Sequence, residues 1–207
     1  MSEATAPTRV GIFVFDEVEV LDCCGPFEVF SVANRVNSLR NGTLPFVLSL
    51  IAKTPEVSAR GGLALRAHQI IDQDPEVDLL LVSGGVTGAV ERDRATISWL
   101  SRSQAQVKAS ICTGAFLLAE AGILTDQRVT THWEDQSALS ARWPSLRVER
   151  DRRWVCDGNV FSSGGISAGI DLSLHLVEVT AGRDLAIATA KQMEYTWVED
   201  AYAPGVR

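Results

Sequence analysis

The segment VKASICTGAFLLAEA (residues 107–121) joins a strand-like apolar run to a helix-like apolar run through a single cysteine. Residues 107–111 are predicted to form a buried strand and residues 113–121 a helix. Cys112 therefore lies on a strand-to-helix turn, with the small residues Ser110 and Gly114 two positions away on either side. Such a turn is tight, and it projects its central side chain from the carboxyl end of a sheet, where α/β proteins bind ligands. We predict that Cys112 is a nucleophile.

Two interpretations of this cysteine compete. The helix that follows offers free N–H groups and the positive end of its dipole, which favour thiolate over thiol. A buried structural cysteine is the alternative, because unpaired Cys is among the most buried residue types. Core cysteines show no preference for a strand-to-helix turn, and this favours the nucleophile.

Outward from this turn, strand-like and helix-like segments alternate along the chain. Strands are predicted at residues 9–15, 46–52, 78–82 and 128–130, with hairpins at 57–67, turning at Gly61-Gly62, and at 148–163, turning at Asp157-Gly158. Helices are predicted from Pro26 to about residue 34, from Asp93 to residue 103, at 134–140, after Ser167 and at 183–195. This alternation predicts an α/β fold with a mostly parallel central sheet and helices on both faces. With no repeat or linker to divide the chain, we expect a flexible tail at 1–8 and one domain over 9–207.

Composition excludes several function classes. A formal net charge of −7 and a pI near 5.0 disfavour nucleic-acid binding. No secretory signal and no membrane-length apolar run is evident, so we expect a cytoplasmic location. Four cysteines at positions 23, 24, 112 and 156 form neither a disulfide framework nor a metal-ligand pattern. We expect no cofactor and no metal.

Asp22 precedes the predicted helix at Pro26 and follows the first strand region. One interpretation is a helix cap, since Asp is common at that position. The functional interpretation is an acid–base partner of Cys112. A carboxyl group enclosed beside a thiolate has its pKa raised by like charge and by desolvation, so it stays protonated and donates to sulfur or substrate.

Two further features are predicted near the same edge of the sheet. Gly84 and Gly85 end a central strand, and their amides are expected to stabilise negative charge on a bound intermediate. His132 follows the helix after Cys112, and it is a candidate base toward that thiol, although a lone histidine is more often structural.

Four segments together resemble a known family. They are FDEVEVLDCCGPFEVF (15–30), VSGGVTG (82–88), SICTGAFLLAEAGILTDQRVTTHW (110–133) and DGNVFSSGGISAGIDLSLHLVE (157–178). The chain resembles the ThiJ/PfpI superfamily of glutamine-amidotransferase-like cysteine proteins over nearly its whole length. The likeness is strongest to the isocyanide (isonitrile) hydratase branch and to the ligand-binding domains of AraC-type regulators. The resemblance implies a flavodoxin-like, glutamine-amidotransferase-like sandwich.

For function, the resemblance implies a small-molecule hydratase. In that branch a cysteine adds to the isocyanide carbon, an acid protonates it, and water converts the thioimidate to an N-substituted formamide. Cys112 would be the nucleophile and Asp22 the acid, while Thr113 would orient water or hold the intermediate. Gly84 and Gly85 match the loop of backbone donors, and His132 matches a histidine whose use varies. The family also implies a homodimer.

Alternatives remain open. Cys23 and Cys24 stand where hydratase relatives usually carry Leu-Thr or similar residues, so a different substrate or a resolving thiol is conceivable. Glyoxalase, deglycase or other hydrolase activity needs the same thiolate. A ligand or redox sensor without turnover is the other class, but only twelve residues follow Tyr195, and we expect no helix-turn-helix module there.

Overall fold

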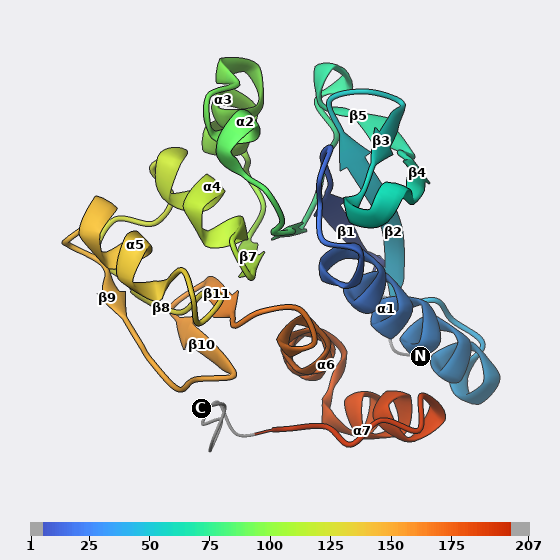
Figure 1. Ribbon diagram of the computed structural model, residues 1–207. Coiled ribbons are helices and arrows are strands. Elements are labelled where there is room, and N and C mark those ends of the chain that lie inside the picture. Colours follow the sequence, from blue (N-terminus) through green and yellow to red (C-terminus); the bar gives the residue numbers. More distant parts are fainter. Residues whose placement is uncertain (1–5, 200–207) are drawn as a thin grey trace.

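The computed structural model describes residues 6–199, and a seven-stranded sheet forms its centre (Figure 1). The strand order is β10-β11-β7-β6-β1-β2-β5. The strands are β1 (Thr8–Phe13), β2 (Phe46–Ala52), β5 (Gln69–Ile70), β6 (Leu79–Val82), β7 (Val107–Ile111), β10 (Trp154–Asp157) and β11 (Val160–Ser163). Every pair is parallel except β10–β11. The predicted mostly parallel sheet is confirmed.

Helices cover both faces of this sheet, as predicted. On one face α1 (Val20–Asn41) and α6 (Ala168–Ala181) pack on the strands, and α7 (Arg183–Gln192) packs against those two helices (Figure 1). On the other face lie α2 (Gly88–Glu91), α3 (Arg94–Arg102) and α4 (Gly114–Glu120). The short helix α5 (Gln136–Arg142) lies beside β9 (Arg147–Val148), which pairs with β8 (Arg128–Val129). Short 3₁₀ helices span Arg60–Gly62 and Ile71–Gln73.

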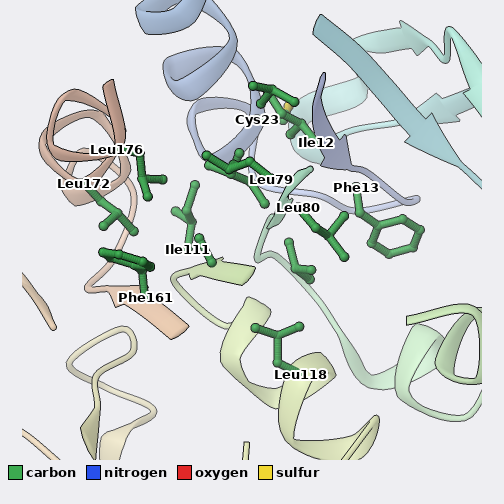
Figure 2. Packing of buried hydrophobic residues seen from close by; sticks show 14 of the residues in the cluster. Ile12, Phe13, Cys23, Leu79, Leu80, Ile111, Leu118, Phe161, Leu172 and Leu176 are labelled. Atoms are coloured by element: carbon green, nitrogen blue, oxygen red, sulfur yellow. The ribbon is translucent and has the colours of Figure 1, made fainter. Parts of the chain in front are cut away.

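Buried apolar side chains fill the space between the layers and hold the end of β7 in place. Leu172 and Leu176 of α6 point toward Ile111, and Leu118 of α4 lies on the opposite side of the sheet (Figure 2). The backbone of α6 approaches closely, because a Cβ built on Gly169 would lie 2.8 Å from Ile111 Cγ2. Ile111 is thereby fixed immediately before Cys112.

The two predicted hairpins are present with changed limits. The first is β3 (Glu56–Ser58) with β4 (Ala64–Arg66), confirmed as a small excursion from the main sheet. The second is confined to β10 and β11, and it turns at residues 158–159 rather than at Asp157-Gly158. Gly158 takes the positive φ of 64° that this turn requires. Val148 belongs to β9 and not to this hairpin.

The prediction for the first helix was wrong at its start. The helix begins at Val20, so Pro26 lies inside it and Asp22 is in its first turn instead of capping it. Proline has no N–H, so the carbonyl oxygen of Asp22, four residues earlier, loses its usual helical partner. The buried Ser83 hydroxyl donates to that carbonyl at 3.3 Å instead. This side-chain bond compensates for Pro26 and ties α1 to the end of β6.

The N-terminal tail is only partly described by the structure. Residues 1–5 of the tail expected at 1–8 lie outside the described residues, and β1 already begins at Thr8. Between residues 6 and 199, no helix has the length and apolar character needed to cross a membrane.

Candidate active site

Cys112 occupies a strained turn between β7 and α4. Its φ is +55°, a conformation that only a small share of non-glycine residues adopts. The backbone N–H of Cys112 lies 3.3 Å from the carbonyl oxygens of both Ser163 and Gly164, at the end of β11. A Cβ on Gly114 would lie 2.1 Å from the Val82 carbonyl oxygen, so the turn needs glycine there. The expected requirement for a small residue after the cysteine therefore has a direct steric cause.

The structure brings Asp22 to this cysteine. The Asp22 carboxyl group is fully buried, and Oδ2 accepts the N–H of Gly84 at 3.0 Å. Oδ1 has no hydrogen bond of ordinary length within residues 6–199. The Cys112 thiol and the backbone N–H of Ile166 both act on this carboxyl group by lowering its pKa. The Cys112 thiol and the Asp22 carboxyl group, distant in sequence, thus lie together in a buried region.

Ile166 is a site residue that sequence reasoning missed. Its backbone N–H lowers the pKa of both the Asp22 carboxyl group and the Cys112 thiol. It does so with a φ of +52°, which is strained for a β-branched side chain. The signal in the sequence was Gly164-Gly165 directly before it, because such a pair permits an unusual backbone path. One backbone amide in this loop therefore affects both the Asp22 carboxyl group and the Cys112 thiol.

Burial governs the protonation of the pair. Removal from water raises the pKa of Asp22 to about 7, and the charge of Glu19 adds to the rise, while the bonds from Gly84, Cys112 and Ile166 oppose it. The raised pKa expected for this carboxyl group is therefore present. It places the carboxyl group near the neutral range, where one residue can serve as both acid and base.

Burial also governs the protonation of the Cys112 thiol. Burial, followed by the negative charge of Asp22, raises the pKa of Cys112 to about 12. Bonds from Thr113 and the Ile166 amide lower it, but these are the smaller effects. The Thr113 amide at the start of α4 thus favours the thiolate, as expected, but the burial of Cys112, which is only 6% exposed, outweighs it. The resting pair is a thiol beside a carboxyl group.

Thr113, Gly84 and Gly85 form the connection between the two partners. The Thr113 hydroxyl accepts from Gly85 N and donates to Gly85 O, both at 2.8 Å. Both glycine amides are thus already bonded to side chains, Gly84 to Asp22 and Gly85 to Thr113. The expectation that they are free donors for an intermediate does not fit this structure. They hold the acid and Thr113 instead, and a Cβ on Gly84 would lie 2.8 Å from Asp22 Oδ2.

His132 lies next to the site with its ring turned to other groups. Its Nδ1 is 3.7 Å and 3.6 Å from carboxylate oxygens of Glu134 and Asp135. Its Cδ2 would be 2.1 Å from a Cβ on Gly165, so the Cδ2 edge of the imidazole faces that glycine. None of the contacts recorded for the ring within residues 6–199 is with Cys112. A role for His132 as base stays a prediction.

A cavity of about 400 Å³ opens beside this loop. Its walls come from residues 131–133, 151–153 and 164–168 together with Gln136. Thr131 lines the cavity and also donates its hydroxyl to the Cys112 carbonyl oxygen at 2.7 Å, a second contact that the sequence did not suggest. Ile166 likewise lines the cavity, and its amide lowers the pKa of the thiol. The reactive pair therefore has a neighbouring space for a small molecule.

The two adjacent cysteines are not part of this pair. Cys23 is fully buried in the core, as expected for one of the two, and burial raises the pKa of its thiol (Figure 2). Its sulfur lies 3.9 Å from that of Cys24, and both are unpaired. Within residues 6–199, no group of three or more His, Cys, Asp or Glu side chains is placed to hold a metal ion.

Comparison with known sequences places these features in a family. The model of the DJ-1/PfpI family matches residues 8–179. The chain is 33% identical over 193 residues to the isonitrile hydratase of Pseudomonas putida, covering 90% of this chain and 78% of the hydratase. It is 29% identical to the HTH-type transcriptional regulator GbdR of Pseudomonas aeruginosa, covering 91% of this chain and about half (51%) of the regulator.

Solved structures agree on the fold. A ThiJ/PfpI family protein from Pseudomonas syringae has a TM-score of 0.81 at 24% identity, covering 92% of this chain and 76% of that one. DJ-1beta of Drosophila melanogaster has a TM-score of 0.79 at 16% identity, covering 93% of this chain and all (100%) of that one. The resemblance inferred from the four segments is confirmed, and the chain belongs to the DJ-1/PfpI family.

Proposed function

We propose that this protein is a cysteine-dependent hydratase of a small electrophile, and that it converts an isocyanide to an N-substituted formamide. The observation that carries the proposal is the enclosed pair of Cys112 and Asp22, with the pKa of the acid near 7. The similarity to an isonitrile hydratase over most of both chains supports the choice of substrate.

The first half of the reaction passes one proton from Cys112 to Asp22 and then to the substrate carbon. Above the pKa of Asp22 the carboxylate accepts the Cys112 proton as sulfur attacks the terminal isocyanide carbon. The protonated Asp22 then delivers that proton to the same carbon, giving the thioimidate R–N=CH–S–Cys112. Water adds to this carbon, the C–S bond breaks, and R–NH–CHO leaves as the thiol regains its proton. Isocyanide plus water thus gives formamide, with no redox change.

Turnover assays test the proposal directly. Purified protein is incubated with phenyl isocyanide and, separately, with methylglyoxal, and the formamide or hydroxyacid product is quantified. We expect formamide from the wild-type protein and none from Cys112→Ala. Conversion of methylglyoxal alone would favour the glyoxalase-type alternative, and no turnover of either compound would reject both enzymatic functions.

A sensor without turnover is the second candidate, since regulators are among the relatives. A redox sensor needs a reactive thiolate, because oxidation follows thiolate character and exposure. The raised pKa and low exposure of Cys112 argue against a redox sensor. Ligand sensing is therefore the form of this second candidate that we retain. Ready formation of a sulfinic acid under mild peroxide would reverse this preference.

The proposal includes a small-molecule partner, a cytoplasmic location and a homodimer. Val179 of α6 and Ile187 of α7 are 51% and 45% exposed, which supplies apolar surface for a contact between two copies. Sedimentation analysis tests the homodimer. We expect the wild-type protein to sediment as a dimer and the double variant Val179→Asp, Ile187→Asp to sediment as a monomer.

A further inference from the structure

The cavity beside the thiol has an exposed aromatic wall. Trp133 lines it and leaves 63% of its surface open, although a tryptophan is usually largely buried. The ring of His132 lies 5.8 Å from the indole at an angle of 35°. Gly165 allows this placement, because any Cβ there would collide with the imidazole. Two rings therefore line one side of the space, and Trp133 has apolar area left uncovered.

The two arginines that line the cavity are each paired with a carboxylate outside its lining. Arg153 is bonded to the fully buried Asp171, with Nε to Oδ2 at 2.6 Å. Arg152 lies 3.3 Å from a carboxylate oxygen of Glu149. Asp151, which also lines the cavity, adds a negative charge. An anionic ligand would have to compete with these carboxylates for the guanidinium groups, so the lining suits a neutral molecule.

Two residues of the cavity wall also interact with Cys112. Thr131 bonds the Cys112 carbonyl oxygen, and the Ile166 amide lowers the pKa of the Cys112 thiol, while both residues line the cavity. An isocyanide is a rod with its reactive carbon at one end and its substituent at the other. With that carbon at sulfur, the substituent would extend past Ile166 toward this space.

We propose that this cavity is the substituent subsite, and that it selects a neutral aromatic group packed against the Trp133 ring. The inference rests on the proposed hydratase function for its reaction, but the binding it describes does not require turnover. Packing between aromatic rings stabilises by about 0.5–1.5 kcal/mol beyond the area it buries, and the upper end of this range corresponds to roughly a tenfold preference.

The kinetic test compares two isocyanides in matched variants. The ratio of kcat/KM for phenyl isocyanide to that for methyl isocyanide is measured in the wild-type protein, in Trp133→Ala and in Leu39→Ala. Leu39 is 84% exposed near the end of α1 and serves as the control for loss of a large surface apolar group. We expect the ratio to fall by about tenfold in Trp133→Ala only. A ratio that does not change in Trp133→Ala overturns the subsite while leaving the hydratase function intact.

The binding test separates the subsite from catalysis. Cys112→Ala protein is titrated with N-phenylformamide, N-methylformamide and 4-formamidobenzoate, and tryptophan fluorescence and calorimetry report binding. We expect N-phenylformamide to bind most tightly, and the second substitution Trp133→Ala to abolish that preference. If the wild-type protein turns over no isocyanide but this binding preference is still found, the hydratase function is rejected and the subsite is kept. Tightest binding of the anionic benzoate, or equal binding of all three, would overturn the aromatic, neutral selectivity.

Discussion

Asp22 should destabilise the folded protein at neutral and alkaline pH, and replacing it with Asn should reveal the cost. Burial raises the pKa of this carboxyl group from the ordinary 3.8 to about 7, so the folded state holds its proton more tightly than the unfolded chain does. At 1.36 kcal/mol per pH unit, the folded state loses about 4 kcal/mol once Asp22 is ionised. The loss begins above the unfolded pKa, grows as the pH rises through about 7 and is constant beyond it.

Urea unfolding of the wild-type protein and Asp22→Asn between about pH 5 and pH 8 measures this effect. The difference in unfolding free energy between the two proteins should change by roughly 3 kcal/mol across that window. The Asp22→Asn variant should become the more stable of the two toward pH 8. The amide can still accept the Gly84 N–H, so that bond is retained. Asp78→Asn is the matched control. Its carboxyl group has a pKa lowered by Arg9, so it stays ionised throughout the window and its stability difference should not vary with pH. Parallel wild-type and Asp22→Asn profiles would refute the buried, proton-retaining carboxyl group.

Three further substitutions test how the pair is held. Glu19→Gln removes a charge that raises the pKa of Asp22, so the midpoint of the same pH-dependent stability difference should move to lower pH; an unmoved midpoint contradicts the assignment. Gly84→Ala places a Cβ 2.8 Å from Asp22 Oδ2 and should cost about 1–3 kcal/mol in urea unfolding, whereas wild-type stability would show that the loop relaxes freely. Thr131→Val leaves the Cys112 carbonyl oxygen without its 2.7 Å hydroxyl donor and should lower the unfolding free energy by about 1–3 kcal/mol; a neutral effect would mean that the elbow does not depend on this bond.

The elbow and the sheet were predictable because their causes are local. Residues 107–111 have the apolar run of a covered strand, and Gly114 marks the sharp turn after Cys112. The start of α1 was not predictable in the same way. Pro26 indicates a helix start by local rules, and only the Ser83 hydroxyl, distant in sequence, makes an interior proline acceptable. Tertiary contact overrode the local preference.

The candidate site also contains residues that the sequence indicated and residues that only the tertiary structure reveals. The sequence indicated Cys112 and Asp22 because both lie near the ends of elements that meet at one sheet edge. The Ile166 amide, the Thr131 hydroxyl and the Glu19 charge act through backbone direction and distance. Gly164-Gly165 indicates an unusual backbone path before Ile166, but not which side chains its amide meets. The state of the thiol was also beyond the sequence, since burial of Cys112 outweighs the nearby amides.

A raised thiol pKa fits a nucleophile here because the proposed reaction needs no standing thiolate. If Asp22 takes the proton of Cys112 while sulfur attacks, the negative charge never rests on sulfur alone, and the cost of burying a thiolate is avoided. An acid with a pKa near 7 can accept that proton and return it to the substrate carbon. The same burial that gives Asp22 this pKa also destabilises the folded protein when the carboxyl group is ionised. Asp22→Asn should therefore be more stable toward pH 8 and inactive as a hydratase, which is the pattern expected when a destabilising side chain is retained for its chemistry.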